Sequence, residues 1–74
     1  MGLNRRDDLF MMQIRLFRMA QIRWNKSVGE CEKIFLEYAI NDYIKMCYEE
    51  FHVQSDEANM DEIDSYLQRK GFRI

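Results

Sequence analysis

The chain has 74 residues, of which 47% are hydrophobic and 14% aromatic, and its formal net charge is −2. This composition excludes a disordered segment, and the length allows one small domain. No apolar run approaches the roughly 20 residues needed to span a bilayer, and no signal-peptide pattern is present. We therefore expect a soluble, cytoplasmic protein. Because proline is absent and there are only three glycines, helices joined by short turns are favoured.

The first helix is predicted over residues 7–24, where an acidic start suits the positive end of the helix dipole. A second helix is predicted over 28–38. Ser27 and Glu30 have the spacing of a capping box, in which the serine hydroxyl accepts from the N3 amide and the glutamate reaches back. The apolar residues that follow repeat at helical intervals, which predicts one buried face.

A third helix is predicted over 42–52 and a fourth over 60–70, with Asn59 at the start of the fourth. Gly71 is expected just past its end, in the left-handed conformation of a Schellman motif. No β-type alternation is present beyond a few residues. The predicted fold is therefore all-α, a single domain formed by a compact bundle of four short helices.

The first predicted helix is more hydrophobic than one buried face requires. On a wheel of about 100° per residue, one side carries a core stripe that comprises Leu9, Phe10, Leu16, Phe17, Ala20 and Trp24. The opposite side carries Met11, Met12, Met19 and Ile22 among arginines. We therefore predict a partner interface made of Met11, Arg15, Arg18, Met19 and Ile22. The alternatives are that the fourth helix or the N-terminal residues cover this side, or that the exposed methionines are scattered and have no function.

His52 is the only histidine and lies among several carboxylates. It is predicted to be structural, ending the third helix and bonding a terminal carbonyl or a loop group. Cys47 lies five residues earlier, about 140° away around the helix, so the two side chains form no local catalytic pair. The spacing of Cys31 and Cys47 matches no zinc site, and the acidic loop lacks the glycine of a calcium loop. We expect no metal, no cofactor and no enzymatic activity.

Charge is distributed unevenly along the chain. Residues 1–26 contain six basic and two acidic groups, a net +4, and residues 27–74 contain five basic and eleven acidic groups, a net −6. This asymmetry permits attraction between the two parts, within one chain or between two. Helices two and three could form a helix-turn-helix, but "DYIKMCYEEFH" has one lysine against three acids. DNA phosphates would repel such a recognition helix, so we do not expect it to bind nucleic acid.

Several short motifs occur in a fixed order between residues 25 and 71. They are Asn25 with Ser27, Phe35 with Tyr38, Asp42-Tyr43-Ile44, Tyr48-Glu49-Glu50-Phe51-His52, and Asp61-Glu62-Ile63-Asp64. In this order they resemble the small bacterial proteins of domain-of-unknown-function family 3791. The chain departs from the family pattern at Val53, where threonine is usual, in a loop without glycine, and in its Arg- and Met-rich first helix.

The family resemblance implies a small all-helical protein without an established activity. Members are often encoded beside proteins that resemble ADP-ribosyltransferases, which implies an antitoxin or an accessory subunit. The leading hypothesis is a non-enzymatic protein–protein interaction module that binds another protein through its first helix. The alternatives are a self-assembling homodimer with a structural role and a nucleic-acid-binding regulator that uses the arginines of that helix.

Overall fold

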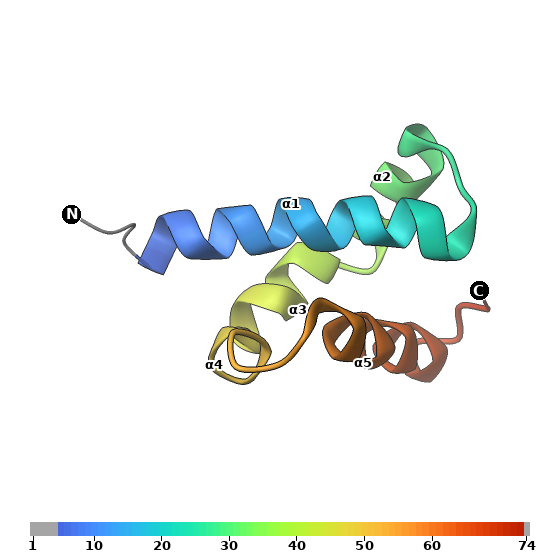
Figure 1. Cartoon of the computed structure of the whole chain (residues 1–74). Coiled ribbons are helices and arrows are strands. Elements are labelled where there is room, and N and C mark those ends of the chain that lie inside the picture. Colours follow the sequence, from blue (N-terminus) through green and yellow to red (C-terminus); the bar gives the residue numbers. More distant parts are fainter. Residues whose placement is uncertain (1–4, 74) are drawn as a thin grey trace.

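The computed structural model describes residues 5–73, and over this range the chain is all-α, as predicted. Its helices are α1 (Arg5–Trp24), α2 (Val28–Glu37), α3 (Ile40–Met46), α4 (Tyr48–Phe51) and α5 (Asp56–Arg69). The longest helix, α1, runs along one side of the molecule, and α2 folds back beside it (Figure 1). Helix α5 and the pair α3–α4 lie on the opposite side of α1, and α1 packs on both α5 and α3.

The core lies between α1 and these helices. On α1 it is formed by residues spaced by four, because every fourth side chain lies on nearly the same face. The buried residues of α1 are Met12, Leu16, Ala20 and Trp24. Those of α3 and α5 include Ile40, Ile44, Met60, Ile63 and Leu67, all completely buried. Two assignments from the helical wheel are therefore wrong: Met12 belongs to the core, whereas Phe10 is 61% exposed.

The turn between α1 and α2 is formed by local signals. Asn25 adopts a left-handed conformation, with φ of 54°, and asparagine tolerates this region better than most residues. The predicted capping box is confirmed. The amide of Glu30 donates to Ser27 Oγ at 3.1 Å, and the amide of Ser27 donates to Glu30 Oε1 at 2.9 Å. Helix α2 therefore begins where the sequence predicted.

The start of the third helix and its continuity were predicted wrongly. The chain reverses at Ala39, which has φ of 51°, and α3 begins at Ile40 rather than at Asp42. An earlier start buries Ile40 completely in the core. The helix is then interrupted at Cys47, whose φ and ψ are −97° and 11°, before α4 begins. Hydrogen bonds from Cys47 N to Tyr43 O and from Phe51 N to Cys47 O continue across this point, so the interruption is local.

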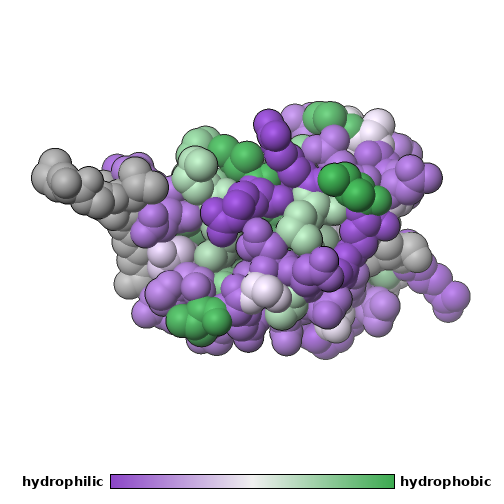
Figure 2. Space-filling view, in the orientation of Figure 1, coloured by the Kyte–Doolittle hydropathy of each residue, from purple (hydrophilic) through white to green (hydrophobic). Residues whose placement is uncertain are grey.

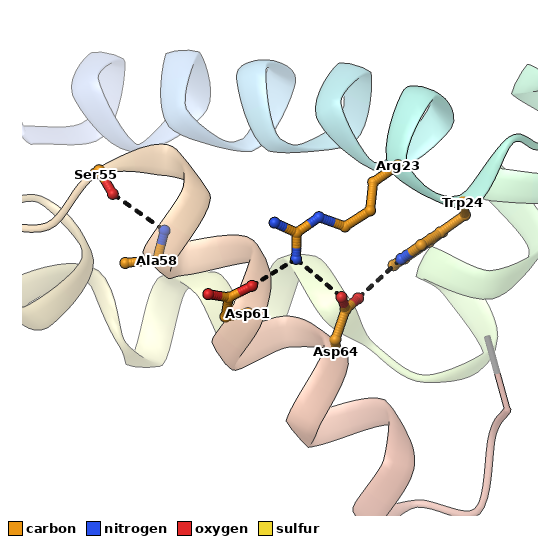
Figure 3. A network of polar contacts seen from close by, with 6 residues as sticks. All are labelled: Arg23, Trp24, Ser55, Ala58, Asp61 and Asp64. Carbon is orange, nitrogen blue, oxygen red and sulfur yellow. Dashed lines mark hydrogen bonds and ion pairs between the residues drawn. The ribbon is translucent and has the colours of Figure 1, made fainter.

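The start of the last helix is also different from the prediction. Helix α5 begins at Asp56, because Ser55 Oγ accepts from the amide of Ala58 at 3.1 Å (Figure 3). Asn59 is consequently inside the helix and completely buried. Its Nδ2 donates to the carbonyl oxygen of Phe51 at 2.9 Å, so it completes the end of α4 instead of capping α5.

The predicted end of α5 is confirmed. Gly71 has φ of 89°, a region that glycine enters without steric cost. The amide of Phe72 donates to Leu67 O at 2.9 Å, and that of Gly71 donates to Gln68 O at 3.0 Å. These are the two hydrogen bonds of a Schellman motif. They direct Phe72 onto the core, where its ring centre lies 5.3 Å from that of Tyr38.

Polar contacts join the last turn of α1 to α5. Arg23 Nη1 lies 2.8 Å from Asp61 Oδ1 and 3.0 Å from Asp64 Oδ2 (Figure 3). The other oxygen of Asp64 accepts from the indole nitrogen of Trp24 at 2.8 Å. Hydrogen bonds from Arg23 to Asp61 and then to Asp64 are the largest causes of a raised Arg23 pKa. Part of the attraction between the basic and acidic parts of the sequence is thus realised within one chain.

Candidate functional site

An apolar groove lies between α1 and α2 in the described structure. It has a volume of about 780 Å³ and is bounded at one end by the start of α3. Its apolar lining consists of Phe10, Ile14 and Phe17 from α1, Phe35 and Leu36 from α2, and Ala39. The α1 residues recur at intervals of three and four, so one continuous stripe of α1 forms a wall.

The floor of the groove is aromatic and its edges are exposed. The rings of Phe17 and Phe35 meet edge to face with their centres 4.9 Å apart, a favourable aromatic arrangement. Phe35 is also part of the core, so the floor is fixed by packing. On the edges, Phe10 is 61% exposed, Ile14 37% and Leu36 82%. Large side chains exposed in this way beside a hollow are typical of interaction surfaces.

The surface around α1 is a mixture of apolar and polar areas. In the view of Figure 2, hydrophobic side chains lie over the N-terminal half of α1, next to strongly hydrophilic ones. Other hydrophobic areas in this view are small and separate. Among the exposed hydrophobic residues outside the groove are Met46 at 82% and Val53 at 74%. Single exposed hydrophobic residues are common on any protein, whereas an apolar groove is not.

Charged residues stand at the borders of the groove. Arg18 lies on the α1 wall, Glu32 on the α2 wall, and Asp42 at the α3 end. Within residues 5–73, none of the three side chains forms an ion pair. The α3 end is fixed to α1 by Gln13, whose Nε2 donates to the carbonyl oxygen of Asn41 at 3.1 Å. A bound polypeptide could therefore contact both an apolar floor and unpaired charges of either sign.

The structure distributes the residues of the predicted partner interface over four environments. Ile22 is 82% exposed and Met11 47% exposed, and Arg18 borders the groove. Met19 is partly buried against the core. Arg15 forms an ion pair with Asp56 of α5 at 3.1 Å, so α5 covers part of this side, as the alternative interpretation allowed. The assignment of the five residues to a partner interface stays a prediction.

Three exposed groove residues were not included in that predicted interface: Phe10, Ile14 and Leu36. Phe10 was assigned to the core, because the wheel shows an almost continuous apolar arc and cannot divide it between core and surface. Leu36 follows Phe35 on α2 and lies outside the buried face of Cys31, Ile34 and Phe35. An apolar residue beside a complete apolar face is a usable signal, and it would have indicated this wall of the groove.

The structural role of His52 stays a prediction, but the expected hydrogen bond to a carbonyl or a loop group is not formed within the described residues. His52 does lie at the C-cap of α4, but its exposed ring stacks on Tyr48, with the ring centres 5.4 Å apart. Its side chain makes no hydrogen bond within residues 5–73. His52 also borders a smaller hollow of about 320 Å³ that is lined in part by Met11 and Arg15.

Metal-binding clusters and disulfides are both absent from the described part of the chain. Between residues 5 and 73, no three His, Cys, Asp or Glu side chains are grouped so that they could hold a metal ion. Neither cysteine is in a disulfide. Burial is the main cause of a raised pKa at Cys31, and a raised pKa disfavours the reactive thiolate. No helix in the described part of the chain is long and apolar enough to cross a membrane.

Fold and surface together define a small all-helical protein that has an exposed apolar groove. The comparison with protein families identifies the group: residues 12–70 match the family described as "Protein of unknown function (DUF3791)". The match covers most of the chain, and the chain therefore belongs to this family, as its motifs suggested. No curated protein and no solved structure gives a significant match.

Proposed function

We propose that this protein is a non-enzymatic protein–protein interaction module whose binding surface is the groove with the adjoining exposed residues of α1. The observation that carries the proposal is the exposure of Phe10, Ile14 and Leu36 around a floor formed by Phe17 and Phe35. Burying these apolar side chains in a complex would favour association by about 25 cal/mol for each Å² removed from water, before the costs of binding are subtracted.

The shape of the groove suits a helix. The α1 residues that line it span Phe10 to Gln21, which corresponds to about 16 Å along the axis, or three turns. Peptide helices commonly bind in apolar grooves of this type through residues spaced by three and four. An antitoxin or accessory role, implied by the family resemblance, is one form that such a module could take.

Two arginines of α1, Arg15 and Arg23, give less support to the nucleic-acid alternative than Arg18, which has no ion pair within residues 5–73. Arg15 pairs with Asp56, and Arg23 pairs with both Asp61 and Asp64. Each of these guanidinium groups therefore already has carboxylate partners in its own chain. Because binding to phosphates depends on cationic groups that can release counterions, such pairing reduces the driving force. We therefore retain protein binding as the proposed function.

Photo-crosslinking in the native cell tests the proposal. Phe10 or Leu36 is replaced with a photoreactive phenylalanine, and Val53, which is 74% exposed but outside the groove, serves as the matched control. We expect a defined protein adduct from the two groove positions and none from Val53. Adding Leu36→Glu to the Phe10 probe should abolish the adduct. Equal crosslinking at all three positions would contradict the proposal.

A further inference from the structure

We propose that the groove is occupied by a second copy of this chain, related by a two-fold axis that brings the two α1 helices together in antiparallel orientation. Phe10 of each copy enters the groove of the other, and Arg18 of each copy faces Asp42 of the other. The inference rests on the proposed function, since it identifies the partner of the same surface.

The groove carries both parts that a symmetric contact needs. In a two-fold interface the same surface must be its own complement, with projections and hollows on each copy. The hollow is floored by Phe17 and Phe35, and the projections are Phe10 and Leu36, which are 61% and 82% exposed. All four belong to one surface. A second copy therefore supplies an apolar side chain for the hollow without any feature from outside this chain.

The charged residues also fit a second copy, because they lie at different positions along the groove. The hydrogen bond from Gln13 to Asn41 places the start of α3, and with it Asp42, beside the N-terminal half of α1. Arg18 is five residues beyond Gln13, about 7.5 Å further along the helix axis. One copy thus has an acidic end and a basic position on the same groove.

An antiparallel crossing near Ile14 exchanges these two positions. By the helix spacing, residue 10 of one copy then lies opposite residue 18 of the other. Arg18 consequently meets the end of the groove that holds Asp42, and it also approaches the ring of Phe10, which an arginine can contact favourably. A parallel arrangement would place Arg18 against Arg18. Charge therefore favours the antiparallel pair, and each dimer contains the Arg18–Asp42 contact twice.

Charge reversal combined with mixing tests the second copy as the occupant. The mass in solution is measured by light scattering after size exclusion, and we expect the wild type to have twice the 9.1 kDa of one chain. Arg18→Glu and Asp42→Arg should each raise the dimer dissociation constant by about tenfold or more, since two attractive contacts become repulsive. An equimolar mixture of the two variants should form a dimer with one copy of each, identified by native mass spectrometry with one copy isotope-labelled.

Matched variants separate this effect from unfolding or from charge in general. Lys45→Glu changes the net charge by the same amount as Arg18→Glu at an exposed position outside the groove, and it should remain dimeric. The double variant Arg18→Glu/Asp42→Arg should also be dimeric, because each contact is restored with its charges exchanged. Circular dichroism is used to check that every variant is folded.

The possible outcomes separate the two proposals. A wild type that stays monomeric at millimolar concentration overturns the second copy as occupant, and so does a dimer that Arg18→Glu and Asp42→Arg leave intact. If such a monomer still gives a groove-specific crosslink to a different protein, the proposed function stands and only its partner is changed. If the groove gives no specific crosslink to either, both proposals are wrong.

Discussion

Asp64→Ala is the substitution with the clearest expected cost, because one carboxylate serves two side chains of α1. Its Oδ1 accepts from the indole nitrogen of Trp24 at 2.8 Å, and its Oδ2 lies 3.0 Å from Arg23 Nη1. Trp24 is only 6% exposed. Once the carboxylate is removed, the buried indole N–H has no acceptor in the described structure, and this costs about 1–3 kcal/mol.

The ion pair with Arg23 contributes less. The two side chains are 29% and 24% exposed, and partly exposed pairs are typically worth about 0.2–1 kcal/mol. Alanine recovers up to about 0.7 kcal/mol through its better helix propensity. The net loss is therefore about 1–3 kcal/mol, which for a domain of this size lowers Tm by about 4–8 °C for each kcal/mol.

Asp61→Ala is the matched control. Asp61 also contacts Arg23 and lies on the same helix, but its side chain is 74% exposed and does not accept the indole hydrogen bond of Trp24, which goes to Asp64. We expect its loss to change the free energy of unfolding by less than about 0.5 kcal/mol, as is usual at the surface. Urea unfolding followed by circular dichroism and by Trp24 fluorescence, at equal protein concentration, measures both variants.

The comparison can refute the argument in two ways. If Asp61→Ala destabilises the protein as much as Asp64→Ala, the indole hydrogen bond is not the main contribution. If Asp64→Ala is just as costly in a Trp24→Phe background, where no indole N–H exists, the same conclusion follows from the double-mutant cycle. Asp64→Asn keeps an acceptor for Trp24 and should fall between the wild type and Asp64→Ala.

Three further predictions concern the helix ends. Ser55→Ala should lower the free energy of unfolding by about 1 kcal/mol, measured by urea unfolding, and no effect would contradict its role as the cap of α5. The pKa of Glu30 is lowered, mainly by the hydrogen bond from the Ser27 backbone and then by the Ser27 hydroxyl. The ionised Glu30 carboxylate therefore stabilises the folded state above the ordinary pKa of 4.5. This stabilisation is lost as the pH falls through the lowered pKa of the folded state. The urea midpoint of Glu30→Gln should therefore lie below that of the wild type at neutral pH and approach it in acid, and a constant difference would contradict this. His52→Ala should change stability by less than about 0.5 kcal/mol, and a larger loss of Tm would show that the exposed stack on Tyr48 matters more than argued.

The sequence was informative wherever a structure depends on residues a few positions apart. The capping box at Ser27 and the glycine-ended α5 are of this kind, because their hydrogen bonds connect residues separated by three to five positions. The start of α5 was predicted wrongly, since both Ser55 and Asn59 are good capping residues. The choice between them depends on Phe51, whose carbonyl oxygen accepts a hydrogen bond from the side-chain amide of Asn59. Ser55 is then the residue that caps α5. The contact between Asn59 and Phe51 is visible only in the fold.

The groove was harder to predict for a different reason. Helix α1 has apolar residues around most of its circumference, and the hydrophobic pattern does not say which of them face α5. The structure divides them: Met12 and Leu16 enter the core, and Phe10 and Ile14 remain at the surface. The exposed apolar residues of α1 differ from the buried ones only in their position relative to helices that are distant in the sequence. A wheel for one helix contains no information about those neighbours.

The contact between α1 and α5 also has a consequence for synthesis. Trp24 and Asp64 are forty positions apart, and the core stripe of α1 packs against a helix that the ribosome makes much later. During translation, the part of the apolar side of α1 that packs on α5 therefore stays exposed until residues 56–69 have left the exit tunnel. Uncovered apolar surface in a nascent chain is prone to aggregation. Chaperone contact during translation should accordingly be concentrated on α1 and should end when α5 emerges.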